Sequence, residues 1–175
     1  LNNSFTYKNF DLSVFFTFSY GGEVLNATKL TNTQAGKSNY NVLDVANSHK
    51  RWMTINANGD IITDPAELAA LNAGKSVVYD MEQGDTYIHS WAVEDASYLR
   101  LSNITIGYNF PRQWIRKASI QKLRLYATGS NLFVWTPYTG FDPEVSTKGN
   151  NLTPGVDFGA YPRSRSFVFG LNVTF

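Results

Sequence analysis

The chain has 175 residues, no cysteine and a formal net charge of +1 at pH 7. This balance predicts no strong attraction to nucleic acid or to anionic membranes, and the absence of thiols excludes disulfide and thiolate chemistry. Aromatic residues make up 15% of the chain and charged residues only 17%, below the roughly 25% of soluble domains. This mixture of aromatic and small polar residues suits strands with one apolar and one polar face.

No stretch of the sequence approaches the ~18 to 20 continuous apolar residues of a transmembrane helix. The first residues, Leu1 to Ser4, lack the basic and apolar regions of a signal peptide. We therefore expect the sequence to begin in the interior of a longer chain.

The first strong pattern lies at residues 10–20, where every second residue is apolar. Residues 4–7 have the character of the end of a preceding strand, and the pair Lys8-Asn9 predicts a tight hairpin between the two. The alternating positions fit a strand with a period of two residues, and they are Phe10, Leu12, Val14, Phe16, Phe18 and Tyr20.

The connection at residues 21–95 shows no sustained period, and a loop of this length usually carries function. Within it, the pair Asn58-Gly59 favours a small hairpin between residues 52–56 and 60–63. A short helix is predicted to follow, with Asp64 as its N-cap, Pro65 at its first position and Gly74 at its end.

The next strand is predicted at residues 96–110, and its two halves differ in phase. Ile104 and Ile106 alternate with polar residues, whereas Leu99 and Leu101 fall on the opposite phase. Two explanations are open: either a bulge lies near Ser102, or the two leucines face inward.

Two further strands are predicted at residues 120–135 and 161–175. A short basic connection precedes the first of them, and a loop at residues 136–160, rich in glycine and proline, separates the two. The last strand places a large apolar residue at every odd position up to the final residue, and these are Phe167, Phe169, Leu171, Val173 and Phe175.

Three features favour strands that cross a membrane over strands of a soluble sheet. The full predicted strands have 11 to about 16 residues, whereas ~5 to 6 is usual in soluble sheets and about 9 to 11 cross a bilayer at a tilt. Their inward positions are rich in Ser, Thr, Asn and Gly, which suits a hydrated lumen. Short and long connections alternate, as in outer-membrane barrels. The alternative is a soluble carbohydrate-binding β-sandwich, whose core would bury the same apolar side chains.

Four linked motifs carry a resemblance to a known family, and they cover nearly the whole chain in order and with compatible spacing. They are WAVEDASYLRLSNIT at residues 91–105, LRLYATGSNLF at 123–133, YTGFDPE at 138–144, and the closing GAYPRSRSF and GLNVTF runs within 159–175. These motifs resemble the C-terminal part of the SusC/RagA family of TonB-dependent outer-membrane transporters.

The resemblance implies an all-β fold, in which residues 1–175 form the last four to five antiparallel strands of a 22-stranded transmembrane barrel. Residues 21–95 and 136–160 would be extracellular loops. The implied function is the active import of oligosaccharides, or of peptides, across the outer membrane of a Gram-negative, Bacteroidetes-like cell, in which the barrel is a multi-pass protein. No enzymatic activity, cofactor or metal is implied.

The resemblance also implies a set of partners. A SusD-like lipoprotein would cover the extracellular mouth, and the TonB complex would supply energy through an N-terminal part that is absent from this sequence. The other expected contacts are outer-membrane lipids and the remaining barrel strands and plug. No contact with nucleic acid is expected.

Loop aromatic residues and one carboxylate are the candidates for contact with a ligand or with the lid, and the plainer alternative is packing beneath the strand ends. A cation site formed by Asp142, Glu144 and Asp157 is a further possibility, but their spacing is looser than that of calcium loops, and a polar turn also explains them. The isolated His49 and His89 predict no catalytic site. The ligand or lid candidates are Trp52, Tyr79, Trp91, Tyr138, Phe141 and Asp142.

The alternating residues of the last strand resemble the signal by which the assembly machinery recognises outer-membrane barrels. They are also expected to face lipid, and the two roles are compatible. The candidate assembly signal consists of Phe167, Phe169, Leu171, Val173 and Phe175.

Overall fold

The computed structural model describes residues 1–33, 41–47, 50–75, 88, 90–144 and 155–175. The chain forms two compact units. Unit 1 contains residues 1–22, 95–143 and 161–175, and unit 2 contains residues 23–94 and 144–160. Each unit is described by itself below.

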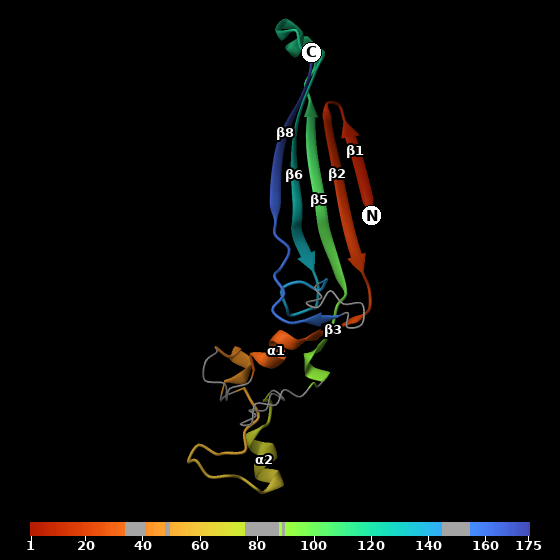
Figure 1. Cartoon of the computed structure of the whole chain (residues 1–175). Helices are drawn as coiled ribbons and strands as arrows, with labels where there is room; N and C mark the ends of the chain where they lie inside the picture. The colour runs from red at the N-terminus through yellow and green to blue at the C-terminus, as the bar shows by residue number, and fades with distance from the viewer. Residues whose placement is uncertain (34–40, 48–49, 76–87, 89, 145–154) are drawn as a thin grey trace. The chain divides into compact units, whose positions relative to one another are not determined.

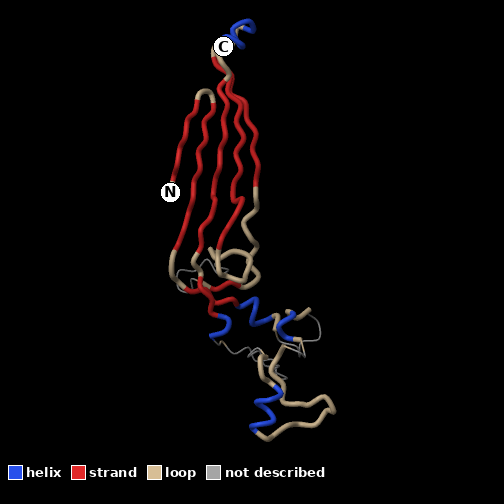
Figure 2. Tube along the Cα trace, turned by 180° about the vertical axis from the view of Figure 1, so that it is seen from behind, coloured by secondary structure: helices blue, strands red, loops and turns tan. Residues whose placement is uncertain are grey.

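Unit 1 is a five-stranded antiparallel sheet with the strand order β1-β2-β5-β6-β8. The strands lie side by side in both views of the chain (Figures 1 and 2). The prediction of an all-β fold with about five antiparallel strands is confirmed. The strands are β1 (Asn2–Tyr7), β2 (Phe10–Ser19), β5 (Tyr98–Asn109), β6 (Lys122–Trp135) and β8 (Ser166–Thr174).

The sheet has two different ends, set by the lengths of its connections. At the turn end, Lys8 adopts a positive φ of 53° and joins β1 to β2 in a two-residue hairpin. At the same end, Pro111 stops β5, and the connection to β6 forms the helical turns α3 (Arg112–Ile115) and η3 (Arg116–Ala118). The long connections at residues 21–95 and 136–160 leave from the opposite end, called here the loop end.

A bulge in β5 resolves the change of phase in its sequence. In the pairing with β2, Leu101 and Asn103 face the consecutive residues Phe16 and Phe15, so that Ser102 is the extra residue. The pairing of β5 with β6 is also irregular between Leu101 and Asn103. Leu99 and Leu101 consequently pair with Phe18 and Phe16 of β2 and share the apolar face of the sheet. The bulge explanation is confirmed, and the inward placement of the two leucines is wrong.

Unit 2 contains short elements that a search for periodicity could not find. Its sheet has the order β4-β3-β7, with Leu25 paired to Val156 in parallel. Strands of two to four residues are too short to show alternation. The elements are β3 (Glu23–Asn26), α1 (Ala27–Thr31), η1 (Asp44–Ala46), α2 (Pro65–Leu71), η2 (Ser90–Ala92), β4 (Val93–Asp95, at the boundary with unit 1) and β7 (Val156–Asp157).

The predicted helix of unit 2 is confirmed at its start and corrected at its end. Asp64 caps α2, because its Oδ1 accepts hydrogen bonds from the N–H groups of Ala66 and Glu67, each at 2.9 Å. The helix ends at Leu71 with Asn72 as its C-cap, two residues before Gly74. The buried Asn72 side chain also donates to the carbonyl of Met53 at 2.8 Å, which fixes the helix to the preceding segment.

The predicted hairpin around Asn58-Gly59 is reduced to a turn with a single bridge, between Ile55 and Ile61. Both isoleucines are exposed, so they bury little surface to support longer strands. No helix in the described part of the chain combines the length and the apolar character needed to cross a membrane.

Candidate functional site

One face of the unit 1 sheet, the outer face, consists of rows of apolar side chains. Because the strands pair in register, residues that alternate along each strand line up across β2, β5, β6 and β8. Two such rows are Phe10–Tyr108–Leu125–Leu171 and Leu12–Ile106–Ala127–Phe169, followed by Val14–Ile104–Gly129–Phe167.

The outer face is exposed instead of packed into a core. Ile106 is 52% exposed and Phe169 is 79% exposed. Moving one such side chain out of water contributes about 1.5–3 kcal/mol, and leaving all of them in water costs more than the net stability of a typical domain, about 5–15 kcal/mol. A sandwich that buries these rows is therefore wrong for this chain. The exposed set includes Phe10, Phe18, Leu99, Ile106, Leu125, Phe133, Trp135, Phe167, Phe169 and Leu171.

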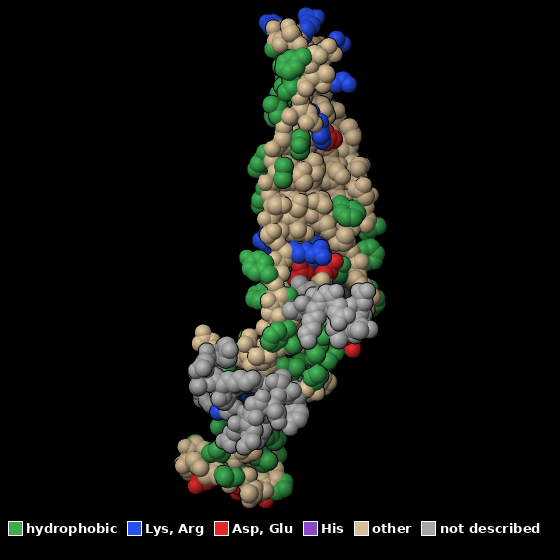
Figure 3. Space-filling model, in the orientation of Figure 1, with side chains coloured by type: hydrophobic (Ala, Val, Ile, Leu, Met, Phe, Trp, Pro, Cys, Tyr) green, Lys and Arg blue, Asp and Glu red, His purple; other side chains and the backbone are tan. Residues whose placement is uncertain are grey.

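The inner face of the same sheet is polar. One row across it is Ser13–Thr105–Thr128–Val168, and the hydroxyls of Thr105 and Thr128 lie 2.9 Å apart. The near face of the sheet in Figure 3 is mostly free of hydrophobic side chains, which project at its margins, and basic and acidic side chains adjoin on it. Such a face suits a hydrated surface and would be a poor protein core.

Near the turn end, an ion pair crosses the inner face over a glycine. Arg124 donates to both carboxylate oxygens of Asp11, from Nε at 3.2 Å and from Nη2 at 2.5 Å. Gly107 lies on the strand between them, and a Cβ atom there would lie 2.5 Å from the Asp11 carboxylate. The absence of a side chain at residue 107 therefore lets a charge pair span three strands.

At the neighbouring edge of the inner face, a tyrosine ring lies close to the backbone of a glycine. Tyr126 pairs with Gly170 of β8, and a Cβ atom at Gly170 would lie 2.2–2.4 Å from atoms of the tyrosine ring and hydroxyl. The Tyr126 ring thus lies across the backbone of β8 at a position where any other residue would displace it.

At the loop end, Ser97 joins three strands. Its hydroxyl accepts a hydrogen bond from the N–H of Gly21 at 2.9 Å, and its carbonyl accepts one from the Thr136 hydroxyl at 2.7 Å. The Ser97 hydroxyl and N–H also donate to Asp95 and hold the pKa of that carboxyl below its usual value. Ser97 therefore fixes the points at which β2, β5 and β6 pass into their connections.

The YTGFDPE segment is anchored to the sheet by a buried ion pair. Arg100 of β5 donates from Nη2 to Oδ1 of Asp142 at 2.6 Å, and their side chains are only 4% and 3% exposed. In the same segment, Tyr138 is buried, whereas Phe141 is 71% exposed. The segment consequently holds its acidic residue inside and presents its phenylalanine outside.

The remaining ligand or lid candidates differ in their surroundings. Trp52 is half-buried in unit 2, and Tyr79 lies outside the described residues. The half-buried Trp91 has Lys29 Nζ 3.9 Å above its ring centroid. Lys29 also forms an ion pair with Glu94 at 2.9 Å, so one face of the Trp91 indole is already occupied within the chain. This contact supports the packing alternative for Trp91.

The carboxylates considered for a cation site have other surroundings in the described part of the chain. In the described residues, no group of three or more histidine, cysteine or acidic side chains is arranged to hold a metal ion. Asp142 instead contacts Arg100. His49 and His89 lie outside the described residues.

The candidate assembly signal lies on the outer face of β8, apart from Phe175, which follows the strand. Phe167, Phe169 and Leu171 are more than half exposed, and Phe175 is 78% exposed. The assignment to lipid contact and the assignment to an assembly signal both require this accessibility.

Sequence periodicity missed Arg100 as a functional residue. Arg100 is a charged residue within a long alternating strand, and its burial is costly unless it has a partner. The identity of that partner, Asp142, is 42 residues away in sequence and requires the fold.

A sheet with an exposed apolar face, a polar opposite face and strands of 9 to 14 residues in β2, β5, β6 and β8 defines the wall of a transmembrane β-barrel.

No family model matches the chain. TonB-dependent receptor P3 of Formosa agariphila is 35% identical over 179 residues, covering 99% of this chain and 16% of that protein. TonB-dependent receptor SusC of Bacteroides thetaiotaomicron is 32% identical over 180 residues, covering 100% of this chain and 15% of that protein.

The chain belongs to the TonB-dependent receptor family of the SusC/RagA kind, and it spans about one sixth of the length of the curated relatives that it matches. Both relatives are named as TonB-dependent receptors. Two solved structures share its fold. The RagAB peptide importer in the open-open state has a TM-score of 0.69 at 22% identity, and the RagAB peptide transporter has 0.70 at 23%. Each match covers 97% of this chain and 16% of the other.

Proposed function

We propose that this chain forms the last strands of the barrel of a TonB-driven importer in the outer membrane of a Gram-negative, Bacteroidetes-like cell. The observation that carries the proposal is the exposed apolar outer face, because its rows require a nonpolar solvent. The family membership supports import as the activity. The strands at the two sheet edges, β1 and β8, would pair with the remaining strands of a closed 22-stranded barrel around a plug.

The orientation follows from the lengths of the connections. Outer-membrane barrels have short periplasmic turns and long extracellular loops. The turn end, with its hairpin at Lys8 and the α3–η3 connection, therefore faces the periplasm. The loop end faces the cell exterior, so that residues 21–95 and 136–160 are extracellular.

The substrate class proposed is an oligosaccharide or a peptide, delivered beneath a SusD-like lipoprotein. The resemblance to the SusC/RagA family supports both choices, and one similar structure is named as a peptide importer. The exposed Phe141 is the feature of unit 1 best placed to contact a ligand or the lid, because Asp142 and Arg100 hold its segment in place.

The test uses the full-length transporter that contains this chain, expressed in its outer membrane. Cells are given a mixture of defined oligosaccharides and peptides, and depletion of each is followed by mass spectrometry. We expect depletion of one class, lost on deletion of the transporter gene and lost equally on deletion of tonB. Depletion that persists without TonB, or that is unchanged without the transporter, would contradict the proposal.

Replacing Phe141 with alanine is expected to weaken capture of the ligand or of the lid without changing the amount of assembled barrel. Loss of a well-packed aromatic anchor typically costs about 2 kcal/mol, a factor of roughly thirty in affinity. Copurification of the lipoprotein and ligand titration measure the two possible losses. Trp114→Ala is the matched control, because Trp114 is 65% exposed but lies at the turn end. Equal effects of the two changes would remove Phe141 from the site.

Deleting Phe175 is expected to lower the amount of assembled barrel severalfold, and Val173→Ala is expected to lower it much less. Both changes remove apolar surface from the same end of the chain, but only the first removes the terminal aromatic residue of the proposed assembly signal. Heat-modifiable mobility of outer-membrane fractions on gels measures the assembled fraction. If the two variants assemble equally well, the residues only face lipid.

A further inference from the structure

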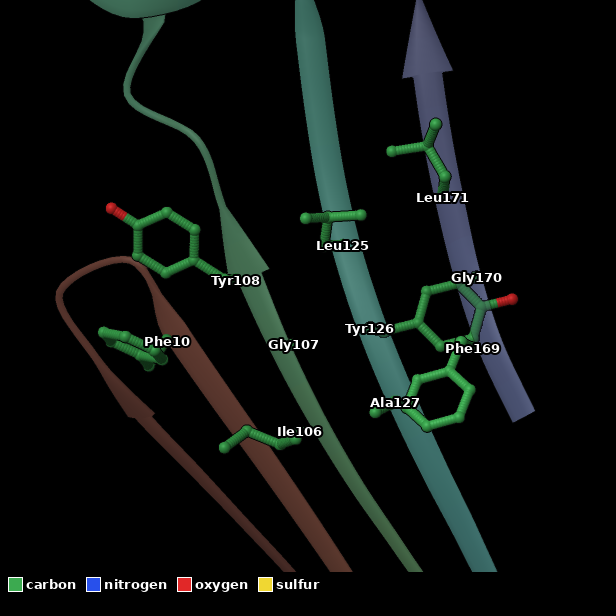
Figure 4. Close-up of a pocket in the computed structure, with 10 residues that line it drawn as sticks. All are labelled: Phe10, Ile106, Gly107, Tyr108, Leu125, Tyr126, Ala127, Phe169, Gly170 and Leu171. Carbon is green, nitrogen blue, oxygen red and sulfur yellow. The ribbon is translucent and has the colours of Figure 1, made fainter. Parts of the chain in front are cut away.

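The outer face is hollowed near the turn end. The hollow has a volume of about 520 Å³, within the ~300–1,000 Å³ of small-molecule pockets. Its lining residues belong to β2, β5, β6 and β8 and are labelled in Figure 4. Ala127 is a small residue in the lining, and the larger residues of the lining include Phe10, Tyr108, Leu125, Phe169 and Leu171.

The hollow extends across the sheet to its edge strand β8. Its lining comes from β2, β5, β6 and β8, and the residues of the row Phe10–Tyr108–Leu125–Leu171 all take part. The lining is almost entirely apolar, since Tyr108 and Tyr126 alone among the lining residues carry a polar side-chain group and the Tyr126 ring lies over Gly170 on the inner face. A flexible hydrocarbon chain is the occupant that such a hollow fits.

A series of aromatic rings leads from the hollow to α3. The ring centroids of Phe10 and Tyr108 lie 4.7 Å apart, those of Tyr108 and Phe110 5.0 Å, and those of Phe110 and Trp114 6.5 Å. Trp114 is 65% exposed, whereas Ile115 next to it is buried. Tryptophan and tyrosine rings prefer the boundary between hydrocarbon and headgroups, so the series marks that boundary at the turn end.

Positive charge gathers beyond this boundary. Residues 110–122 contain Arg112, Arg116, Lys117 and Lys122 and no aspartate or glutamate, although the whole chain carries a net charge of only +1. Arg112, Arg116 and Lys117 are exposed on α3 and η3. Guanidinium and ammonium groups at this level suit a phosphate oxygen.

We propose that the hollow and the α3–η3 connection together bind one anionic glycerophospholipid of the inner leaflet. One acyl chain occupies the hollow above Ala127, the Trp114 ring lies at the level of the ester groups, and Arg116 and Lys117 contact the phosphate. The proposal rests on the orientation given under the proposed function, in which the turn end faces the periplasm. Charge complementarity and continuity with the lipid-facing rows both select a lipid over a protein partner.

The test is native mass spectrometry of the full-length barrel in detergent, titrated separately with phosphatidylglycerol and phosphatidylethanolamine. We expect one phosphatidylglycerol to be retained in preference to phosphatidylethanolamine. Each basic residue at an anionic lipid surface contributes about fivefold in affinity, so Arg116→Gln with Lys117→Gln should weaken phosphatidylglycerol binding by roughly twenty-fivefold. Ala127→Phe fills the hollow and should weaken binding of both lipids.

The matched control is Lys50→Gln with Arg51→Gln, which neutralises an adjacent basic pair in the connection at residues 21–95. This control should leave lipid binding unchanged, and heat-modifiable mobility confirms that every variant is a folded barrel. Equal loss in both double variants, equal affinity for the two lipids, or binding that survives Ala127→Phe would overturn the proposal. Substrate uptake is measured separately, so a transporter that imports normally without selecting a lipid refutes only this site.

Discussion

Replacing Arg100 with glutamine is expected to destabilise the loop end by about 3–5 kcal/mol, because the Asp142 carboxylate loses its guanidinium partner while its side chain stays only 3% exposed. Asp142 can reach water only if the YTGFDPE segment leaves the sheet. The urea midpoint of the folded barrel should fall, and limited proteolysis should cut within residues 136–144 faster than in the unmodified protein.

A double variant separates the loss of charge balance from the loss of volume. Arg100→Met with Asp142→Leu removes both charges and keeps the site filled, and such replacements of buried pairs are often neutral. We expect its urea midpoint to lie close to that of the unmodified protein and well above that of Arg100→Gln. Equal destabilisation of the single and double variants would mean that the ion pair does not anchor the segment.

Placing arginine at Phe169 is expected to cost about 2–4 kcal/mol, since a guanidinium on the lipid side of a barrel is most unfavourable near the middle of the bilayer. Phe169 lies near the middle of β8, in the row with Ile106 and Ala127, and is 79% exposed. Folding into lipid vesicles at a series of urea concentrations measures the change in free energy.

The adjacent residue provides the matched control. Val168 points to the opposite, polar face and pairs with Thr128, so Val168→Arg places the same charge toward the lumen. We expect a cost below about 1 kcal/mol there, because lumen substitutions remain hydrated. If Val168→Arg is the more damaging change, the two faces of the sheet have been assigned the wrong way round.

The long strands of unit 1 were predictable because the alternation of apolar and polar residues is repeated many times along each of them. Phe10, Leu12 and Val14 all lie on the same face, so that one irregular residue does not hide the two-residue period. The two-residue hairpin at Lys8 and the cap at Asp64 were predictable from local chemistry alone. The elements of unit 2 were not, because β3 and β7 depend on pairing between residues about 130 positions apart, such as Leu25 and Val156.

The candidate site was predictable only in part, for the same reason. Sequence indicated that the loop aromatics and Asp142 merit attention, but it could not show that Asp142 is buried and Phe141 exposed within one turn. The ion pairs Arg100–Asp142 and Asp11–Arg124 join residues 42 and 113 positions apart. Neither pairing leaves a local signal, because opposite charges at such separations are common by chance.

The extra residue at Ser102 changes which alternate positions of β5 face outward within a single membrane crossing. On its two sides, the side chains of the outer face fall at odd and then at even positions: Leu99 and Leu101 before it, Ile104 and Ile106 after it. An algorithm that scores one fixed parity over ten residues would see two weak half-segments here and could leave this crossing out of its count. Counting the crossings of such a chain from sequence therefore requires allowing one shift of parity in each.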